Sequence, residues 1–119
     1  RHFVSWLIVF YGLQYCMYTI LQSKKFTEWF DNLRDRTGKF RILARLRRVE
    51  LGNLGDVKAL GEGLYEMRMM VGPGYRLYYT QRGPTLIFLL AGGDKSTQDN
   101  DIKRAKEIAR TIGEHHEPS

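Results

Sequence analysis

The sequence predicts an α+β domain with the element order β-α-α-β-β-β-α, in which helices pack on one face of a small, largely antiparallel sheet. Three observations lead to this fold class. The chain has 119 residues, which is enough for one hydrophobic core and too few for two. Apolar residues recur at helical spacing in two early stretches and one late stretch. Between these stretches, runs rich in β-branched and aromatic residues are separated by glycine-proline turns.

The first half of the domain is predicted to be a strand followed by two helices. Tyr18–Leu21 combines aromatic and β-branched residues, as strands do. Ser23 can cap a helix that runs to about Arg36. Four apolar residues at positions i, i+3, i+4 and i+7 form its buried side: Phe26, Trp29, Phe30 and Leu33. After Thr37-Gly38 breaks this helix, a second one runs from about Lys39 to Leu51.

The second half is predicted to be a loop, three strands and a helix. The loop, Leu54–Gly63, contains three glycines. Two turns of the Gly-Pro type separate the strands, which are Leu64–Val71, Tyr75–Gln81 and the nearly all-apolar Thr85–Ala91. The last helix is expected over about Asn100 to Ile112, with Thr97, Asp99 or Asn100 as its cap.

The globular domain is predicted to occupy residues 17–113, between an apolar leader at 1–16 and a polar tail at 114–119. The leader is interpreted as an upstream extension, with translation starting at Met17. The alternative is a membrane or interface anchor, because positions 3–21 carry no charge. The single cysteine, Cys16, excludes an intramolecular disulfide and a cysteine-based zinc cluster, which favours a reducing, cytoplasmic location.

Basic residues outnumber acidic ones, and part of the excess follows one helix. The chain has 19 Lys and Arg against 13 Asp and Glu, so its net charge is +6 and an anionic partner is expected. Arg41, Arg45 and Arg48 are spaced to share one helix face. Besides an ordinary solvated face, this stripe suggests contact with a phosphate backbone or a groove for an acidic partner segment.

The two strands around Gly72 predict a second basic site. A hairpin centred on Gly72 pairs residue i with residue 144−i, so Arg68 faces Arg76 and Glu66 faces Tyr78. Met67 and Leu77 then lie on the opposite, helix-packed face. Two arginines directly across from each other favour a bound anion, so this face is interpreted as a phosphate-binding surface. The alternative is a solvated sheet face on which Glu66 neutralises Arg68.

The segment Gly92-Gly93-Asp94-Lys95 places Lys95 near the end of the sheet, although its spacing is not that of a Walker A loop. The predicted core offers no histidine, which excludes a Ser-His-Asp triad or a two-histidine ribonuclease mechanism. His115 and His116 lie in the polar tail, where a weak metal site is conceivable but a disordered tail is the preferred interpretation. No metal and no cofactor is expected.

Several linked motifs together carry a family resemblance that covers about Met17 to Gly113. These motifs are Phe26-x-x-Trp29-Phe30, Gly52-Asn53 with Gly55-Asp56-Val57-Lys58, Gly61-x-Gly63-Leu64-Tyr65-Glu66-Met67-Arg68, Gly72-Pro73-Gly74-Tyr75-Arg76-Leu77-Tyr78-Tyr79, and Gly92-Gly93-Asp94-Lys95-Ser96-Thr97-Gln98 with Asp101-Ile102 and Ala105. In these motifs the chain closely resembles the addiction-module killer proteins, a HigB-like branch of the RelE/ParE toxin superfamily. The element order of a RelE-like fold agrees with the one predicted above.

This resemblance implies a type II toxin that cuts messenger RNA on the ribosome. The 2′-hydroxyl would attack the adjacent phosphate without a metal. The catalytic residues that it implies, together with those that could move protons, are Arg68, Arg76, Lys95, Glu66 and Tyr78. The RNA-binding residues expected beside them are Arg41, Arg45, Arg48 and Arg82. The late tyrosine of RelE has no clear counterpart here, since Gln98 lies in that region, so the general base is left open.

The implied partners are the ribosome with its messenger RNA and a cognate antitoxin, expected to be a HigA-like helix-turn-helix protein. Operator DNA would be bound only through the antitoxin complex. Two alternatives stay open at this point. One is a ParE-like inhibitor of DNA gyrase that binds without cleaving RNA, and the other is a degenerate or anchored member whose leader redirects it.

Overall fold

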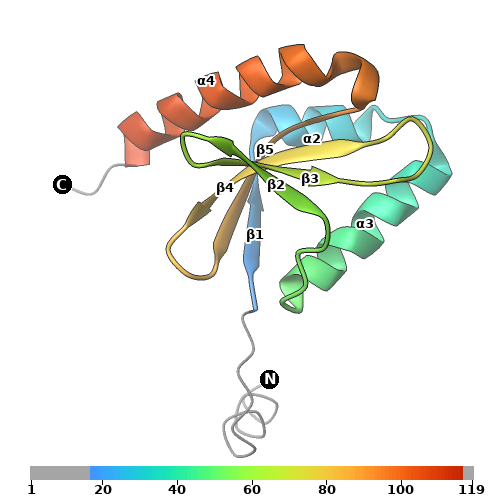
Figure 1. Cartoon of the computed structure of the whole chain (residues 1–119), viewed down its shortest axis with the longest axis horizontal. Helices are drawn as coiled ribbons and strands as arrows, with labels where there is room; N and C mark the ends of the chain where they lie inside the picture. The colour runs from blue at the N-terminus through green and yellow to red at the C-terminus, as the bar shows by residue number, and fades with distance from the viewer. Residues whose placement is uncertain (1–16, 117–119) are drawn as a thin grey trace, which may run out of the picture.

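The structure is a computed structural model that describes residues 17–116, and these residues form helices around one mixed sheet (Figure 1). Predictions about residues 1–16 and about the last three residues lie outside this range. The elements, in chain order, are β1 (Thr19–Gln22), α2 (Lys24–Asp31), α3 (Arg36–Glu50), β2 (Val57–Gly61), β3 (Leu64–Arg68), β4 (Arg76–Arg82), β5 (Leu86–Gly93), the short 3-10 helix η1 (Lys95–Thr97) and α4 (Gln98–His116).

The five strands of this part of the chain lie in the order β1-β5-β4-β3-β2, and only β1 and β5 are parallel. The predicted α+β class with a largely antiparallel sheet is therefore confirmed. The prediction of a loop over Leu54–Gly63 is wrong, because Val57–Gly61 forms the edge strand β2. Two of the three glycines that suggested a loop serve the β2–β3 turn instead, where Gly61 and Gly63 have φ of 91° and 79°.

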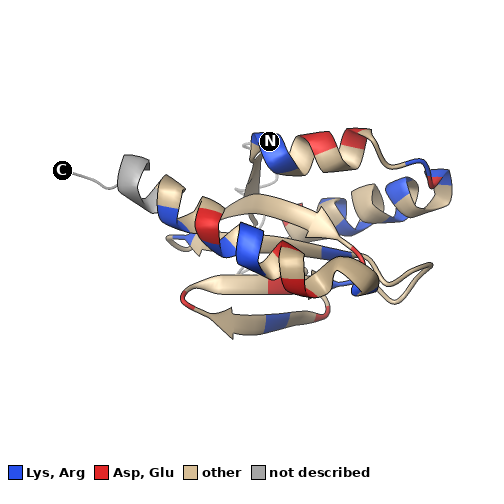
Figure 2. Cartoon of the chain, turned by 90° about the horizontal axis from the view of Figure 1, so that it is seen from above, with Lys and Arg blue, Asp and Glu red and all other residues tan. Residues whose placement is uncertain are grey.

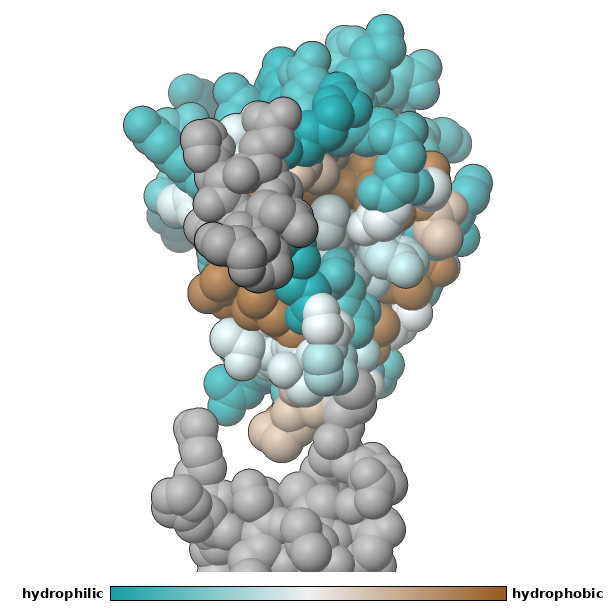
Figure 3. Space-filling model, turned by 90° about the vertical axis from the view of Figure 1, so that its left-hand side faces the viewer, coloured by the Kyte–Doolittle hydropathy of each residue, from teal (hydrophilic) through white to brown (hydrophobic). Residues whose placement is uncertain are grey.

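Helices cover both faces of the sheet, which corrects the prediction that they pack on one. The cluster under α2 and α3 includes Phe26, Ile42, Met67 and Leu77. The cluster under α4 lies on the other face and includes Leu64, Tyr78, Leu90 and Ala105. Alternate residues of β3 and β4 point to opposite faces, so each strand supplies both clusters. Seen from the end at which α4 stops, hydrophilic side chains cover the upper surface, with hydrophobic ones visible below (Figure 3).

The helix ends differ from the predicted ones for reasons of capping and packing. Ser23 caps α2 as predicted, accepting a hydrogen bond from the Phe26 amide at 3.0 Å. α2 ends at Asp31, and Asp35 then caps α3 through the Gly38 amide at 3.0 Å. Gly38 therefore lies in the first turn of α3 instead of breaking a helix. A Cβ there would lie 2.6 Å from the Tyr75 ring, so glycine permits close packing.

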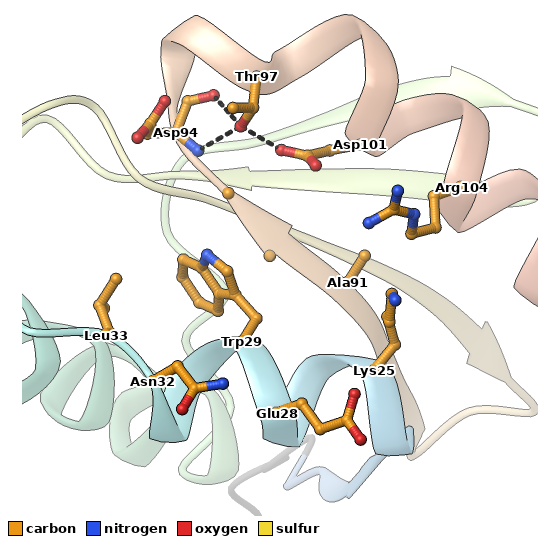
Figure 4. A pocket seen from close by; sticks show the side chains of 12 residues that line it. Lys25, Glu28, Trp29, Asn32, Leu33, Ala91, Asp94, Thr97, Asp101 and Arg104 are labelled. Atoms are coloured by element: carbon orange, nitrogen blue, oxygen red, sulfur yellow. Dashed lines mark hydrogen bonds between the residues drawn. The ribbon is translucent and has the colours of Figure 1, made fainter.

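Gly92 and Gly93 bring β5 into close contact with α2 and α4 (Figure 4). The cap of the last helical segment is Asp94, upstream of the three predicted candidates, and Thr97 completes a capping box. Thr97 also donates a hydrogen bond to the buried carboxylate of Asp101. A Cβ on Gly93 would overlap that carboxylate, which explains a glycine here without any ligand. No helix within residues 17–116 combines the length and the apolar character needed to span a membrane.

Replacing Gly92 with alanine is expected to destabilise the domain by about 1–3 kcal/mol, as overpacked cores are. The added methyl carbon would lie 2.3 Å from the indole of Trp29. Urea unfolding followed by circular dichroism measures the loss. Adding Trp29→Leu to the variant removes the obstructing ring, so it should recover part of the midpoint. An unchanged midpoint for Gly92→Ala would contradict this packing.

Candidate active site

The predicted register of the β3–β4 hairpin is confirmed residue by residue. Arg68 pairs with Arg76, Glu66 with Tyr78, and Met67 with Leu77. On its other side Arg76 pairs with Gly93 at the end of β5, and the amide of Lys95, two residues later, donates to the Pro73 carbonyl at 3.4 Å. Arg68, Arg76 and Lys95 are therefore brought to one end of the sheet, and they are called the basic row below.

Arg76 is the most firmly held member of the basic row. Its Nε lies 3.5 Å from the Glu66 carboxylate, and its Nη1 donates to the Gly74 carbonyl at 2.9 Å. The side chain is 15% exposed, so it is partly buried yet reaches the surface. Gly74 has φ of 78°, and a Cβ there would lie 3.3 Å from Nη1. A rigid guanidinium at the surface can donate to a phosphate in a defined direction.

The carboxylate of Glu66 is buried beneath α4, so this part of the sheet face is not the solvated surface that the alternative interpretation of the sequence proposed. Glu66 is 1% exposed and Tyr78 is fully buried. The Tyr78 hydroxyl donates to Glu66 Oε2 at 3.1 Å, and the Gln98 amide of α4 donates to the same oxygen at 2.9 Å. Burial, with the carboxylate of Glu66 nearby, raises the pKa of Tyr78 above its ordinary range. Tyr78 is therefore a neutral hydrogen-bond donor at pH 7.

Arg68 is paired with Asp56, and not with Glu66 as one interpretation of the sequence proposed. Its Nη2 lies 3.2 Å from Asp56 Oδ1, and both side chains are more than a third exposed, at 37% and 44%. Ion pairs with this exposure contribute about 1 kcal/mol or less, so a phosphate could replace the Asp56 carboxylate at little cost. Asp56 and Gly74 belong to motifs of the sequence, but their contacts with Arg68 and Arg76 were not predicted, because no local pattern shows that a loop residue folds back onto a strand.

The predicted arginine stripe on α3 is wrong at its central member. Arg45 is buried at 7% exposure, whereas Arg41 and Arg48 are exposed. Its guanidinium donates to the carbonyls of Leu54, Asp56 and Arg68 at distances between 2.8 and 3.1 Å. Burial lowers the pKa of Arg45 from its ordinary value. Arg45 therefore connects the loop before β2 to α3, and four of its five N–H donors are used by these carbonyls instead of facing RNA.

Arg82 lies away from the basic row. It ends β4 opposite Leu86, whereas Arg76 begins the same strand opposite Gly93. Six residues of extended strand separate them by about 20 Å. Lys and Arg residues mark α3 and the start of α2, and both signs of charge alternate along α4 (Figure 2).

A cleft of about 510 Å³ lies between α2 and α4, beside the end of β5 (Figure 4). Trp29 forms one wall, and the charged side chains around it have both signs: Lys25, Glu28, Asp94, Asp101 and Arg104. Burial raises the pKa of Asp101, opposed by its hydrogen bond from Thr97. None of the predicted site residues lines this cleft, and its mixed charge does not favour an anionic ligand.

The free energy of unfolding is expected to fall as the pH rises from 10 to 12. Burial raises the pKa of Tyr75 and of Tyr79 from 10.0 to about 12, and the Tyr75 hydroxyl also donates to Asp35 at 2.7 Å. Between these pH values the unfolded chain releases protons that the folded chain retains, so unfolding is favoured. Urea midpoints across this range measure the effect, which Tyr75→Phe should reduce. A midpoint independent of pH would contradict it.

Comparison with known proteins gives a relative and a fold. No family model matches the chain. An uncharacterized protein of Haemophilus influenzae is 44% identical over 88 residues, which cover 74% of this chain and 89% of that protein. Among solved structures, a mutant of the E. coli toxin RelE in the free state superposes with a TM-score of 0.57 at 18% identity, covering 74% of this chain and 97% of that one.

The identity and extent of the first match are sufficient for a family assignment, and the second match shows the fold. The RelE neighbour has the α+β arrangement observed here, and it confirms the fold that the motifs imply. The chain belongs to the same family as the Haemophilus influenzae protein, and its domain has the RelE-like fold.

Proposed function

We propose that this protein is a HigB-like toxin of a type II toxin-antitoxin system that cuts messenger RNA on the ribosome. The observation that carries the proposal is the basic row: Arg68, Arg76 and Lys95 converge at one end of a RelE-like sheet. RNA cleavage passes through a transition state in which the non-bridging oxygens of the scissile phosphate carry extra negative charge. Fixed cationic donors stabilise such a state more than they stabilise the substrate.

The proposed reaction is an internal transfer of the phosphodiester. The 2′-oxygen attacks the adjacent phosphorus, so that the O2′–P bond forms and the P–O5′ bond breaks. The 2′-hydroxyl loses its proton and the departing O5′ gains one, leaving a 2′,3′-cyclic phosphate and a 5′-hydroxyl. Lys95 is an exposed member of the basic row, and its ammonium group is proposed to protonate O5′. A group of the ribosome would accept the proton of the 2′-hydroxyl.

Glu66 and Tyr78 are proposed as positioning residues, since their burial beneath α4 keeps them from the substrate. Glu66 attracts Arg76 Nε at 3.5 Å and is itself oriented by hydrogen bonds from Tyr78 and Gln98. This arrangement fixes the guanidinium of Arg76 before RNA arrives, which is the condition for efficient electrostatic stabilisation. Arg76 and Arg68 are proposed to hold the scissile phosphate between them.

The proposed partners follow from the same function. The ribosome presents the messenger RNA, in the cytoplasm, and a cognate antitoxin encoded beside the toxin neutralises it. The antitoxin is proposed to be a HigA-like helix-turn-helix protein that also carries the complex to operator DNA. Arg41, Arg48 and Arg82 are exposed or half-exposed, but they lie outside the basic row and have no proposed role in the cleavage step.

Induced expression of the full chain in bacteria, followed by mapping of messenger RNA 5′ ends, tests this function. Growth arrest with new 5′ ends in phase with codons is expected from cleavage in the ribosomal A site. Growth arrest with intact RNA and induction of the DNA-damage response would instead indicate a ParE-like inhibitor of gyrase. Normal growth and intact RNA at full expression would contradict a toxin of either type.

A further inference from the structure

The cleft of about 510 Å³ between α2 and α4 has no part in the proposed cleavage step. We call it the α2–α4 cleft. It forms because β1 pairs with β5 only along Leu86–Leu89, so within residues 17–116 no strand covers the same edge of Ala91–Gly93. The chain turns into α2 at this point, and α2 and α4 border the space from either side (Figure 4). A cleft of this size can take a small organic ligand.

One wall of the α2–α4 cleft is an indole ring. Trp29 projects from α2 toward the end of β5 (Figure 4), and its ring lies so close to Gly92 that a Cβ there would be 2.3 Å away. The ring is still partly exposed, and it lines the cleft. Packing against β5 therefore fixes the ring without covering it. A fixed aromatic surface of this kind can stack with flat unsaturated rings, including those of nucleobases.

The opposite wall of the cleft carries a hydrogen-bond acceptor and a donor side by side. Asp101 and Arg104 lie three residues apart on one face of α4, and both line the cleft. Asp101 is 9% exposed and accepts a hydrogen bond from Thr97, but a carboxylate can accept several. Burial raises the pKa of Asp101, opposed by the Thr97 bond and by the nearby charge of Arg104. Arg104 forms no ion pair with any residue of the described range, so its guanidinium is available to a ligand.

We propose that the α2–α4 cleft is a binding site for a guanine base. Guanine presents one oxygen acceptor and two N–H donors in a row along its Watson–Crick edge. The Asp101 carboxylate can accept from both donors and Arg104 can donate to the oxygen, while the base stacks on Trp29. Adenine and cytosine have a nitrogen acceptor where guanine has its ring N–H, so they would turn an acceptor toward the carboxylate. Uracil has a single N–H donor between two oxygens.

The charges of the cleft favour a neutral base over an ionic ligand. The acids Glu28, Asp94 and Asp101 outnumber the bases Lys25 and Arg104, so a phosphate would meet more repulsion than attraction. A cationic amine would be attracted to Asp101, but it would place a like charge beside Arg104. A neutral ring that carries both donors and an acceptor can satisfy both side chains at once.

The α2–α4 cleft borders the basic row. Gly93 lines the cleft and pairs with Arg76 in the neighbouring strand, so their Cα atoms lie about 4.5–5.5 Å apart. Asp94 also lines the cleft and directly precedes Lys95. The base can therefore belong to a nucleotide of the RNA that the basic row holds, or to a free guanine nucleotide bound beside it. Both sources have the same recognition chemistry, and only the first rests on the proposed function.

Calorimetric titration of the purified full chain with guanosine, which carries no phosphate, tests the site. Guanosine is expected to bind, while inosine, which lacks the 2-amino donor, and adenosine should bind at least about tenfold more weakly. Asp101→Asn replaces one acceptor oxygen with a donor and should weaken guanosine binding by at least the same factor. Asp99→Asn makes the same change at an exposed position of α4 outside the cleft, and it should bind guanosine as the wild type does. Arg104→Gln, with Lys103→Gln as its control, provides a second pair if Asp101→Asn fails to fold.

The results also distinguish this site from the proposed function. No binding of guanosine by the wild type, equal binding of adenosine, or undiminished binding by Asp101→Asn and Arg104→Gln would overturn the guanine site. With guanosine binding established, a map of messenger RNA 5′ ends in which Asp101→Asn loses cuts beside guanine assigns the base to RNA. An unchanged map assigns it to a free nucleotide. Normal growth on expression of the wild type would contradict the proposed function, whereas selective binding of guanosine would still support the site.

Discussion

Replacing Arg76 with alanine is expected to abolish growth arrest, because it removes the donor that is fixed in place before RNA binds. The guanidinium lies between the Glu66 carboxylate and the Gly74 carbonyl, at 3.5 and 2.9 Å. Loss of one fixed donor to a transition-state oxyanion typically lowers the rate about 10²–10³-fold. The cleavage rate measured on purified ribosomes should fall by this factor, and Arg68→Ala should lower it in the same direction.

A matched double variant separates catalysis from folding. Arg76→Ala leaves the buried carboxylate of Glu66 without its cation, which is destabilising in itself. Adding Glu66→Gln removes that buried charge, so Arg76→Ala with Glu66→Gln should recover the thermal stability but not the cleavage. If the double variant regained wild-type cleavage, Arg76 would serve only to neutralise Glu66. Full arrest by the well-folded single variant would exclude Arg76 from the chemistry.

Replacing Arg45 with methionine is expected to lower the free energy of unfolding by about 3 kcal/mol, since buried acceptors would lose a charged donor. Arg45 donates to Leu54, Asp56 and Arg68 carbonyls, which belong to the loop before β2 and to the end of β3. Urea denaturation followed by tryptophan fluorescence measures the change. Arg45→Lys should restore little stability, because one ammonium cannot span three carbonyls in the directions that a guanidinium reaches.

The neighbouring arginines of α3 provide the control for this effect. Arg41→Met and Arg48→Met remove the same charge from exposed positions, and each should change stability by about 0.5 kcal/mol or less. Three variants of equal and small effect would contradict the structural role assigned to Arg45. Such a result would indicate that Arg45 belongs to the solvated stripe that its spacing suggests.

The hairpin could be predicted from sequence because its alternation and the position of its Gly-Pro-Gly turn agree on one register. Pairing i with 144−i, centred on Gly72, puts Met67 and Leu77 on the same face as the other apolar residues, and the structure has that pairing. Since a slip by one residue would turn every side chain to the opposite face, the pattern is decisive. The basic row follows from this register together with the end of β5.

The polar groups under α4 could not be predicted in the same way. Glu66 and Tyr78 alternate with apolar residues, as the residues of a solvated face do, yet α4 returns over them and Gln98 donates to Glu66. Arg45 has the spacing of an exposed residue, and it is buried because a distant loop presents carbonyls to it. In both cases contacts with distant parts of the chain decide whether the side chain is buried, and such contacts cannot be predicted from the local periodicity of the sequence.

The measurement that tests the central claim most directly is cleavage of messenger RNA on purified ribosomes, with the chemical ends of the product identified. Wild-type protein is expected to produce a 2′,3′-cyclic phosphate and a 5′-hydroxyl at a position set by the A site. The same RNA without ribosomes should be cut far more slowly, and Arg76→Ala should leave it uncut on the same time scale. Intact RNA with the wild-type protein, or equal cleavage by Arg76→Ala, would contradict the claim that the basic row is an RNA-cleaving site.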